Sequence, residues 1–309
     1  MNGILLIDKP VGMTSRAIVD LCIRKTGVKS IGHAGTLDPF ASGLLPVCFG
    51  RATKLVSYIH LGVKSYQTVI HLGRCTDTCD DTGRMIWESM AFPPFHEKLL
   101  KSVLEHFKGQ ISQKTPLYSA RKINGRRLYK LARHAEPVVL PTKDVRIDRI
   151  QMIEYRHPDI LCEIDCSSGT YIRQLGYDIG VRLGCGAVLT SLRRMSVGTY
   201  HVEDAIRPDI REFDAATIRR RLLDPTTAVF ALRTLIIRPA SESKARNGCR
   251  LIADDLLEKS KVCRFDGQEV AVVSENGVLI SICRVELEGS EQNSGNFVLK
   301  TVRVIDISR

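Results

Sequence analysis

The spacing of apolar residues along the chain predicts a mixture of strands and helices. Residues 3–7 form a short apolar run typical of a buried strand, and residues 64–72 alternate between polar and apolar side chains as a half-buried strand does. Further strands are expected near 145–155 and 160–167. On the last of these, one face would carry four apolar side chains, those of Ile160, Cys162, Ile164 and Cys166.

Helices are predicted where apolar residues recur every three or four positions. One covers 15–27, with Ser15 as its N-cap, and others cover 99–107, 172–183 and 211–223. From about residue 234 the pattern changes to short strands, which indicates a small β-rich second domain with its boundary near 225–233. These strands are expected at Leu235–Ile237, Val262–Phe265, Glu269–Ser274, Val278–Val285 and Phe297–Ile307.

Composition is that of a globular protein with room for two domains. The chain has 309 residues, 44% of them hydrophobic and 26% charged. The longest uninterrupted apolar run is the five residues 228–232, too short for a transmembrane helix, and the first residues resemble no secretory signal. We therefore expect a cytoplasmic protein without a membrane partner.

The charge is strongly basic, with 45 Lys and Arg against 34 Asp and Glu. Residues 1–232 hold 33 basic and 23 acidic side chains, whereas residues 233–309 hold 12 and 11, so the surplus belongs to the first three quarters of the chain. Nucleic acid is the favoured partner of such a surface, and a merely solubilising charge is the alternative.

The ten cysteines do not indicate a metal site. The pairs Cys75/Cys79 and Cys162/Cys166 have three-residue gaps, whereas structural zinc sites favour tighter Cys-x-x-Cys hooks. Cys162 and Cys166 also lie on the apolar face of a predicted strand. We therefore expect no metal, and disulfides are disfavoured in a chain without a secretory signal.

One loop places a carboxylate in a tightly specified backbone. Residues 32–46 contain three glycines and two prolines, and Asp38 directly precedes Pro39, which holds it in an extended conformation. Asp38 is either a turn-capping residue or a carboxylate presented to a substrate as nucleophile or base.

A second segment has the character of an RNA-binding surface. Residues 114–133 carry seven basic side chains, no acidic ones and two tyrosines. Lys and Arg neutralise phosphates and tyrosine rings stack on bases, so nucleic-acid contact is favoured over a solvated helix face. Arg126, Arg127 and Lys130 are the candidate contacts.

A third segment, residues 167–175, is predicted to end a strand, turn at Gly169 and begin a helix. Such a junction offers backbone N–H groups to an anion. Tyr171 and Arg173 would stand in the first turn, the first able to stack and the second to bind a phosphate or a carboxylate.

Together these segments resemble the TruB family of bacterial tRNA pseudouridine-55 synthases over about residues 1–230. The resemblance is carried, in order, by Asp8-Lys9-Pro10-Val-Gly12-Met-Thr14-Ser15, Gly32-His33-Ala-Gly35-Thr-Leu37-Asp38-Pro39, Lys64-Ser-Tyr66, Tyr118-Ser-Ala-Arg-Lys122, Gly169-Thr-Tyr171-Ile-Arg173 and Leu192-Arg193-Arg194. The C-terminal part resembles the PUA-type RNA-binding domain of such enzymes.

The resemblance implies an α+β fold. It consists of a pseudouridine synthase domain over 1–230, with a central mixed, largely antiparallel sheet flanked by helices, and a PUA-like domain over 231–309. A thumb-like RNA-binding segment would lie near 114–142. The implied reaction converts uridine 55 in the T-loop of tRNA to pseudouridine by base flipping, without cofactor or metal. The partner is the T-arm of tRNA, and a monomer without an obligatory protein partner is expected.

The resemblance also implies roles for individual residues. Asp38 would be the nucleophile and Arg173 would pair with it and hold the carboxylate charged. Tyr66 would pack on the flipped uracil, and Tyr171 and Leu192 would line the pocket. His33 would stack among the extruded bases, and Lys9 would be a supporting basic residue. Ser168 stands where the family often has Lys.

Three questions stay open at this point. Tyr66 is either a core aromatic on an alternating strand or a stacking platform. Asp38 would attack C1′ or C6, or abstract the 2′ proton in a glycal route. The alternatives to the implied function are a pseudouridine synthase for another RNA, such as a guide-RNA enzyme, and an RNA-binding or RNA-folding protein without catalysis.

Overall fold

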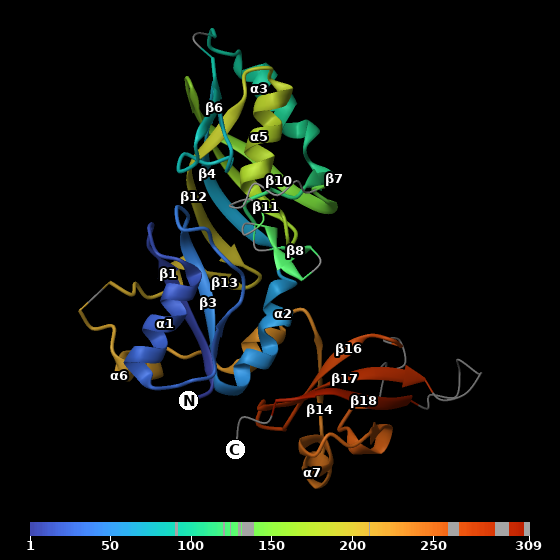
Figure 1. The fold of residues 1–309 in the computed structure, drawn as a ribbon. Helices are drawn as coiled ribbons and strands as arrows, with labels where there is room; N and C mark the ends of the chain where they lie inside the picture. Colours follow the sequence, from blue (N-terminus) through green and yellow to red (C-terminus); the bar gives the residue numbers. More distant parts are fainter. Residues whose placement is uncertain are drawn as a thin grey trace.

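The computed structural model describes residues 1–89, 92–119, 121–123, 125–128, 131, 139–209, 211–258, 266–287 and 297–305. Its largest element is a nine-stranded sheet with the order β1-β3-β12-β4-β11-β10-β7, in which β2 also pairs with β3 and β13 with β12 (Figure 1). These strands are β1 (Gly3–Lys9), β2 (Ile31–His33), β3 (Ser42–Phe49), β4 (Lys64–Leu72), β7 (Gly109–Lys114), β10 (Thr142–Arg156), β11 (Asp159–Cys166), β12 (Ala187–Val197) and β13 (Tyr200–His201).

The central sheet is mixed and largely antiparallel, which confirms the predicted fold class. Its one parallel pairing joins β12 to β3, and the other pairings along the order are antiparallel. This parallel pairing connects the half of the sheet built from β1–β3 to the half built from β4, β10 and β11. The predicted apolar face of β11 is also confirmed, since all four of its side chains are fully buried.

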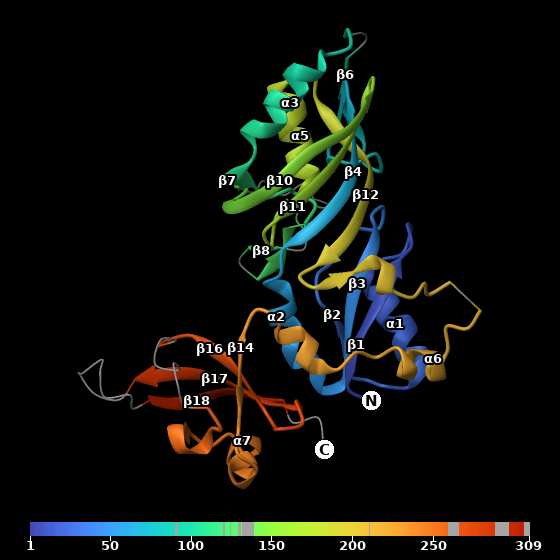
Figure 2. The same cartoon turned by 180° about the vertical axis from the view of Figure 1, so that it is seen from behind.

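Most of the helices pack beside the central sheet, and short hairpins lie outside its strand order (Figures 1 and 2). The helices are α1 (Ser15–Thr26), α2 (Val56–His60), α3 (Glu97–His106), α5 (Ile172–Arg182), α6 (Ala215–Arg220) and α7 (Glu242–Arg246). The hairpins pair β5 (Arg74–Thr76) with β6 (Met85–Glu88), and β8 (Lys122–Ile123) with β9 (Arg126–Arg127).

Two helix predictions are corrected by the caps. Thr14, not Ser15, is the N-cap of α1, because its side chain accepts a hydrogen bond from the Ala17 amide. The helix expected over 211–223 is shorter, since Asp214 accepts a hydrogen bond from the Thr217 amide at 2.8 Å and starts α6 at Ala215.

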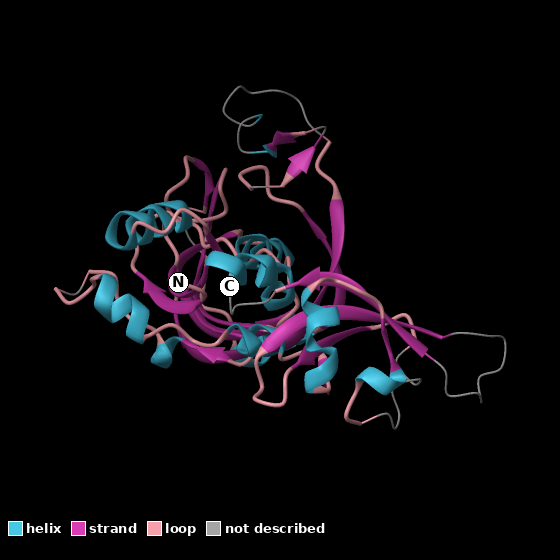
Figure 3. Ribbon diagram, turned by 90° about the horizontal axis from the view of Figure 1, so that it is seen from below, coloured by secondary structure: helices cyan, strands magenta, loops and turns pink. Residues whose placement is uncertain are grey.

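The C-terminal part is a five-stranded sheet with the order β14-β16-β17-β18-β15, and strands predominate in both parts of the molecule (Figure 3). It contains β14 (Arg233–Ile236), β15 (Leu251–Ile252), β16 (Glu269–Val273), β17 (Leu279–Leu287) and β18 (Phe297–Val304). The strand predicted at 262–265 lies outside the described residues.

The C-terminal sheet is docked on α2 (Figures 1 and 2). Tyr58 on α2 donates a 2.7 Å hydrogen bond to Glu269, and Arg303 donates one of 2.8 Å to the Lys54 carbonyl. A shared apolar cluster, which includes Ile59 and Val273, fills the space between them. Only three residues separate the end of α2 from the start of β4, so this docking also holds the segment that leads into β4.

Candidate active site

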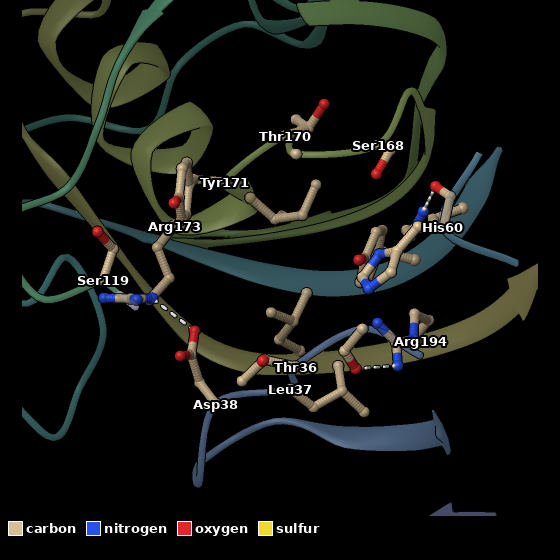
Figure 4. A pocket seen from close by; sticks show the side chains of 16 residues that line it. Thr36, Leu37, Asp38, His60, Ser119, Ser168, Thr170, Tyr171, Arg173 and Arg194 are labelled. Carbon is tan, nitrogen blue, oxygen red and sulfur yellow. Dashed lines mark hydrogen bonds and ion pairs between the residues drawn. The ribbon is translucent and has the colours of Figure 1, made fainter. Parts of the chain in front are cut away.

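A pocket of about 280 Å³ opens where the two halves of the sheet meet (Figure 4). Its walls come from the loop 35–38, the end of α2, strands β4 and β12, and the turn that leads into α5. The three residues that the resemblance implies for catalysis, Asp38, Tyr66 and Arg173, line it together, and so do its two expected pocket residues, Tyr171 and Leu192. The structure therefore brings together segments far apart in the sequence.

Buried polar side chains hold the backbone of the loop that carries Asp38. Ser15 Oγ accepts from the Leu37 amide at 2.8 Å and donates to the Leu37 carbonyl at 3.0 Å. The Lys9 ammonium donates to the Met13 carbonyl at 2.7 Å and to the Pro10 carbonyl at 2.9 Å. On the other side of Asp38, the Pro39 carbonyl accepts from the Gly12 amide at 2.7 Å and from the Lys9 ammonium at 3.5 Å. With the backbone held on both sides, the Asp38 side chain points into the pocket (Figure 4) and is 37% exposed.

Lys9, expected as a supporting and substrate-binding basic residue, is fully buried and does not line the pocket. Burial lowers the pKa of its ammonium to about 8, while nearby Asp38 acts in the opposite direction. The Lys9 ammonium contacts the Asp38 loop through the Pro39 carbonyl, 3.5 Å away.

Arg173 is the centre of the polar network around Asp38. Its Nε lies 2.9 Å from Asp38 Oδ2 (Figure 4), and its terminal nitrogens donate to the Thr78 carbonyl at 2.6 Å and to the Tyr118 carbonyl at 2.9 Å. The side chain is only 5% exposed. A rigid guanidinium held at several points fixes the carboxylate with which it pairs.

Asp80 is a second carboxylate beside Arg173 that the sequence patterns did not reveal. Its Oδ2 lies 3.6 Å from Arg173, and its side chain is 5% exposed. Oδ1 accepts hydrogen bonds from both Thr78 and Thr82 side chains. A sequence signal existed in the run Thr76-Asp-Thr-Cys-Asp-Asp-Thr82, whose closely spaced acceptors and hydroxyls are typical of a side-chain-stabilised turn.

Tyr66 and Leu192 form part of the pocket wall from adjacent strands. Tyr66 on β4 lies opposite Arg194 on β12, two residues beyond Leu192. Tyr66 is 8% exposed, and burial raises the pKa of its hydroxyl. Tyr66 belongs to the main apolar cluster and also lines the pocket, so the two interpretations of this residue are not exclusive.

Tyr171 is the N-cap of α5 rather than a residue of its first turn. Its backbone N–H donates to Gln113 Oε1 at 2.8 Å. This amide is therefore occupied, and the expected anion site at the strand–helix junction loses one of its donors.

The end of the pocket opposite Asp38 is cationic (Figure 4). The Lys64 ammonium donates to the His60 and Gly62 carbonyls, both at 3.0 Å, and Arg194 donates to the Leu44 and Gly35 carbonyls. Burial, together with Arg194, lowers the pKa of Lys64 to about 8. Among the described residues, neither side chain pairs with a carboxylate. The sequence motifs contained both residues but indicated no role for them.

His33 ends β2 and lies outside the pocket lining. Burial and the nearby Arg194 and Arg16 lower the pKa of its imidazole, so the ring is held neutral at neutral pH. Within the basic segment, Arg126 on β9 is exposed, and Arg127 is its neighbour on that strand. Lys130 lies outside the described residues.

The described residues contain no group of three or more His, Cys, Asp or Glu side chains arranged to hold a metal ion. Their cysteines are free thiols. No helix in this part of the chain is long and apolar enough to cross a bilayer.

Comparison with solved structures shows the fold. A protein of an H/ACA ribonucleoprotein bound to a substrate RNA has a TM-score of 0.73 at 22% identity, with 98% of this chain and 84% of that chain covered. A chain of the archaeal box H/ACA Nop10–Cbf5 complex has a TM-score of 0.72, also at 22% identity, over 98% and 86%. The chain therefore has the fold of these solved proteins over nearly its whole length, and its β-rich C-terminal sheet is consistent with the expected PUA-like domain.

Comparison of sequences shows the family. Residues 24–172 match the model of the TruB family pseudouridylate synthase N-terminal domain. The chain is 34% identical to tRNA pseudouridine synthase B of Geotalea uraniireducens, over 100% of this chain and 99% of the relative. It is 38% identical to that of Mycobacterium bovis, over 89% and 92%, respectively. With these relatives matched along nearly their whole length, the chain belongs to the TruB family of pseudouridylate synthases.

Proposed function

We propose that this tRNA pseudouridine synthase isomerises uridine 55 in the T-loop, with Asp38 as the nucleophile and without a cofactor. The observation that carries the proposal is the Asp38–Arg173 pair, which lies in a pocket that also contains Tyr66 and Tyr171. The relatives named tRNA pseudouridine synthase B support tRNA as the substrate. The choice of position 55 rests on the resemblance of the motifs.

The reaction needs a carboxylate that is fixed but still accessible. The C1′–N1 bond breaks and a C1′–C5 bond forms, while C5 loses a proton and N1 gains one, so the formula of the nucleotide is unchanged. Arg173 binds Oδ2 of Asp38, and the exposed third of the side chain is available to the substrate. A covalent step at Asp38 would divide one difficult substitution into two easier ones.

The pocket suits a flipped base. Extruding a base from a stacked loop costs a few kcal/mol, which contacts inside the pocket must offset. Tyr66 supplies an aromatic surface and Leu192 an apolar one, from neighbouring strands. His33 is held in its neutral form, which suits stacking among the other bases of an opened loop.

The remaining parts of the chain would bind RNA around this site. Residues 1–230 form the catalytic domain, the basic segment at 114–142 contacts the RNA backbone, and residues 231–309 form the PUA-like RNA-binding domain. The protein would act as a cytoplasmic monomer on the T-arm of tRNA.

The proposal is tested by incubating the protein with an unmodified T-arm hairpin, with no guide RNA or second protein present. Chemical mapping then shows which uridine has become pseudouridine. The expected product is pseudouridine at the T-loop position corresponding to 55. Modification elsewhere, or activity that requires a guide RNA, would contradict the proposed substrate.

A further inference from the structure

Gln113 is a buried polar side chain that contacts a pocket residue without lining the pocket. It lies on β7, is 2% exposed, and makes two hydrogen bonds with the backbone of Tyr171. Its Oε1 accepts from the Tyr171 N–H at 2.8 Å, and its Nε2 donates to the Tyr171 carbonyl at 3.1 Å. The side-chain amide of Gln113 thereby binds both the backbone N–H and the backbone C=O of Tyr171, as a neighbouring β-strand would.

Tyr171 needs such an external anchor because of its place in α5. It occupies the N-cap, where Ser, Thr, Asp or Asn normally fixes the start of a helix by a side-chain hydrogen bond. A tyrosine side chain does not supply that bond, and none is present here. Since the ring of Tyr171 lines the pocket, the residue is held through its backbone by Gln113 instead.

The stretch of chain that follows Gln113 also contacts Arg173. Five residues after Gln113, the Tyr118 carbonyl accepts a 2.9 Å hydrogen bond from Arg173. The stretch between is held by the Thr115 amide, which donates to the Pro141 carbonyl at 2.9 Å. Tyr171 and Arg173 are thus both hydrogen-bonded to the stretch of chain at the start of the basic segment 114–142.

We propose that Gln113 is a positioning residue that couples the basic segment to the pocket by holding Tyr171 in place. RNA contacts made by this segment would then be transmitted to Tyr171 through Gln113 and to Arg173 through Tyr118. The proposal rests on the proposed function in taking the pocket as the active site and the basic segment as an RNA-binding element.

A purely structural Gln113 would behave differently. If the side chain only satisfies buried backbone groups, its loss lowers the melting temperature and leaves the rate of the folded protein unchanged. If it positions Tyr171, its loss slows isomerisation even when RNA is saturating, because a small misplacement of a pocket group is costly to the reaction.

The experiment compares Gln113→Met, which keeps the length of the side chain but removes both hydrogen bonds, with Gln110→Met. Gln110 lies on the same strand and is exposed, so it is a matched control. Melting temperature, affinity for an unmodified tRNA transcript and the single-turnover rate at saturating RNA are measured well below the lowest melting temperature. Total pseudouridine is counted at all positions, so the result does not depend on which uridine is modified.

We expect Gln113→Met to slow the single-turnover rate by about 10-fold or more, with RNA affinity changed by less than about 3-fold. Gln113→Glu, which keeps the acceptor for the Tyr171 amide, should recover part of the rate. In a Tyr171→Ala background the Gln113→Met change should add little further loss, because both act through one residue. Gln110→Met should match the unaltered protein.

A rate for Gln113→Met equal to that of Gln110→Met would overturn the proposal, as would a full additional loss in the Tyr171→Ala background. If Gln113→Met does not fold, the rate of Gln113→Leu, which also removes both hydrogen bonds, decides the question by the same comparison. Pseudouridine formed at a site other than position 55 would overturn the proposed function but leave this inference standing.

Discussion

Arg173 Nε lies 2.9 Å from Oδ2 of Asp38, although 135 positions separate the two residues in the chain. The arginine is 5% exposed and the aspartate 37% exposed, so a nearly immobile cation orients a carboxylate that solvent and substrate can reach. The Thr78 and Tyr118 carbonyls hold the rest of the guanidinium. The Asp38 carboxylate is thus the accessible end of a fixed network.

Removing the second carboxylate of this network should impair the enzyme although Asp80 does not line the pocket. In Asp80→Asn, Arg173 loses a buried negative charge 3.6 Å away, and the hydrogen bonds from Thr78 and Thr82 lose a charged acceptor. We expect a lower melting temperature and a single-turnover rate reduced by about 10-fold or more. Asp81→Asn, at the exposed neighbouring position, serves as the control and should behave as the unaltered protein.

Tyr66 should show both a structural and a catalytic role when substituted. Because it is buried in the main apolar cluster, Tyr66→Ala should cost about 3–5 kcal/mol of stability as well as activity. Tyr66→Phe keeps the ring, so melting temperature and RNA affinity should stay near those of the unaltered protein. Its single-turnover rate then measures the contribution of the hydroxyl. A large fall in the melting temperature of Tyr66→Phe would show that the hydroxyl is needed mainly for folding.

Local patterns predicted elements well where a helix or strand buries one continuous face. The strand over 64–72 matches β4 at both ends, because its alternation reflects a sheet covered on one side. The predicted helix over 211–223 is too long because its start depends on one hydrogen bond, from the Thr217 amide to Asp214. Apolar spacing carries no information about such a bond.

The site was predictable where the chemistry lay in compact motifs and not where it depended on tertiary structure. Asp38 and Arg173 stand in distinctive local sequences. Asp80 meets Arg173 only because a turn after β5 folds against the start of α5, and Gln113 meets Tyr171 only through the position of β7 at the edge of the sheet. No spacing within one segment encodes these pairings.

The basic segment should make RNA binding steeply dependent on salt. Replacing Arg126, Arg127 and Lys130 with glutamine should weaken binding and flatten the slope of log affinity against log salt by up to about 3 units, near one for each phosphate that the protein no longer neutralises. The control replaces three exposed arginines with glutamine, namely Arg219, Arg220 and Arg221 at the end of α6. This helix lies away from β8 (Figures 1 and 2). Equal slopes in the two triple variants would mean that the basic segment faces solvent.

Lys9 should give a distinctive pH dependence of stability. Its pKa is about 8 in the folded protein and 10.5 without burial, so between these values the unfolded chain binds the proton more strongly. The contribution of Lys9 to the free energy of unfolding therefore increases as pH rises from 8 to 10.5. Below pH 8 both states are protonated and the full cost of burying the charge remains.

Urea unfolding of the unaltered protein and of Lys9→Met at pH 8, 9 and 10 tests this sign. The unfolding free energy of the unaltered protein should rise with pH relative to that of Lys9→Met, by at most about 3 kcal/mol. Lys29→Met, at an exposed position, should show a difference from the unaltered protein that does not change with pH. A relative fall for the unaltered protein over this range would contradict the account of Lys9 as a buried ammonium.

The most direct test of Asp38 as the nucleophile is position-resolved mapping of pseudouridine in an unmodified T-arm hairpin after incubation with saturating Asp38→Asn protein. Glycine and proline residues define the loop, Ser15 binds the Leu37 backbone, and Lys9 donates to the Pro39 carbonyl at 3.5 Å. The variant should therefore fold and bind the hairpin nearly as the unaltered protein does. We predict pseudouridine at the T-loop uridine with the unaltered protein and none with Asp38→Asn. More than a trace of pseudouridine formed by the variant would contradict the assignment of Asp38 as the nucleophile.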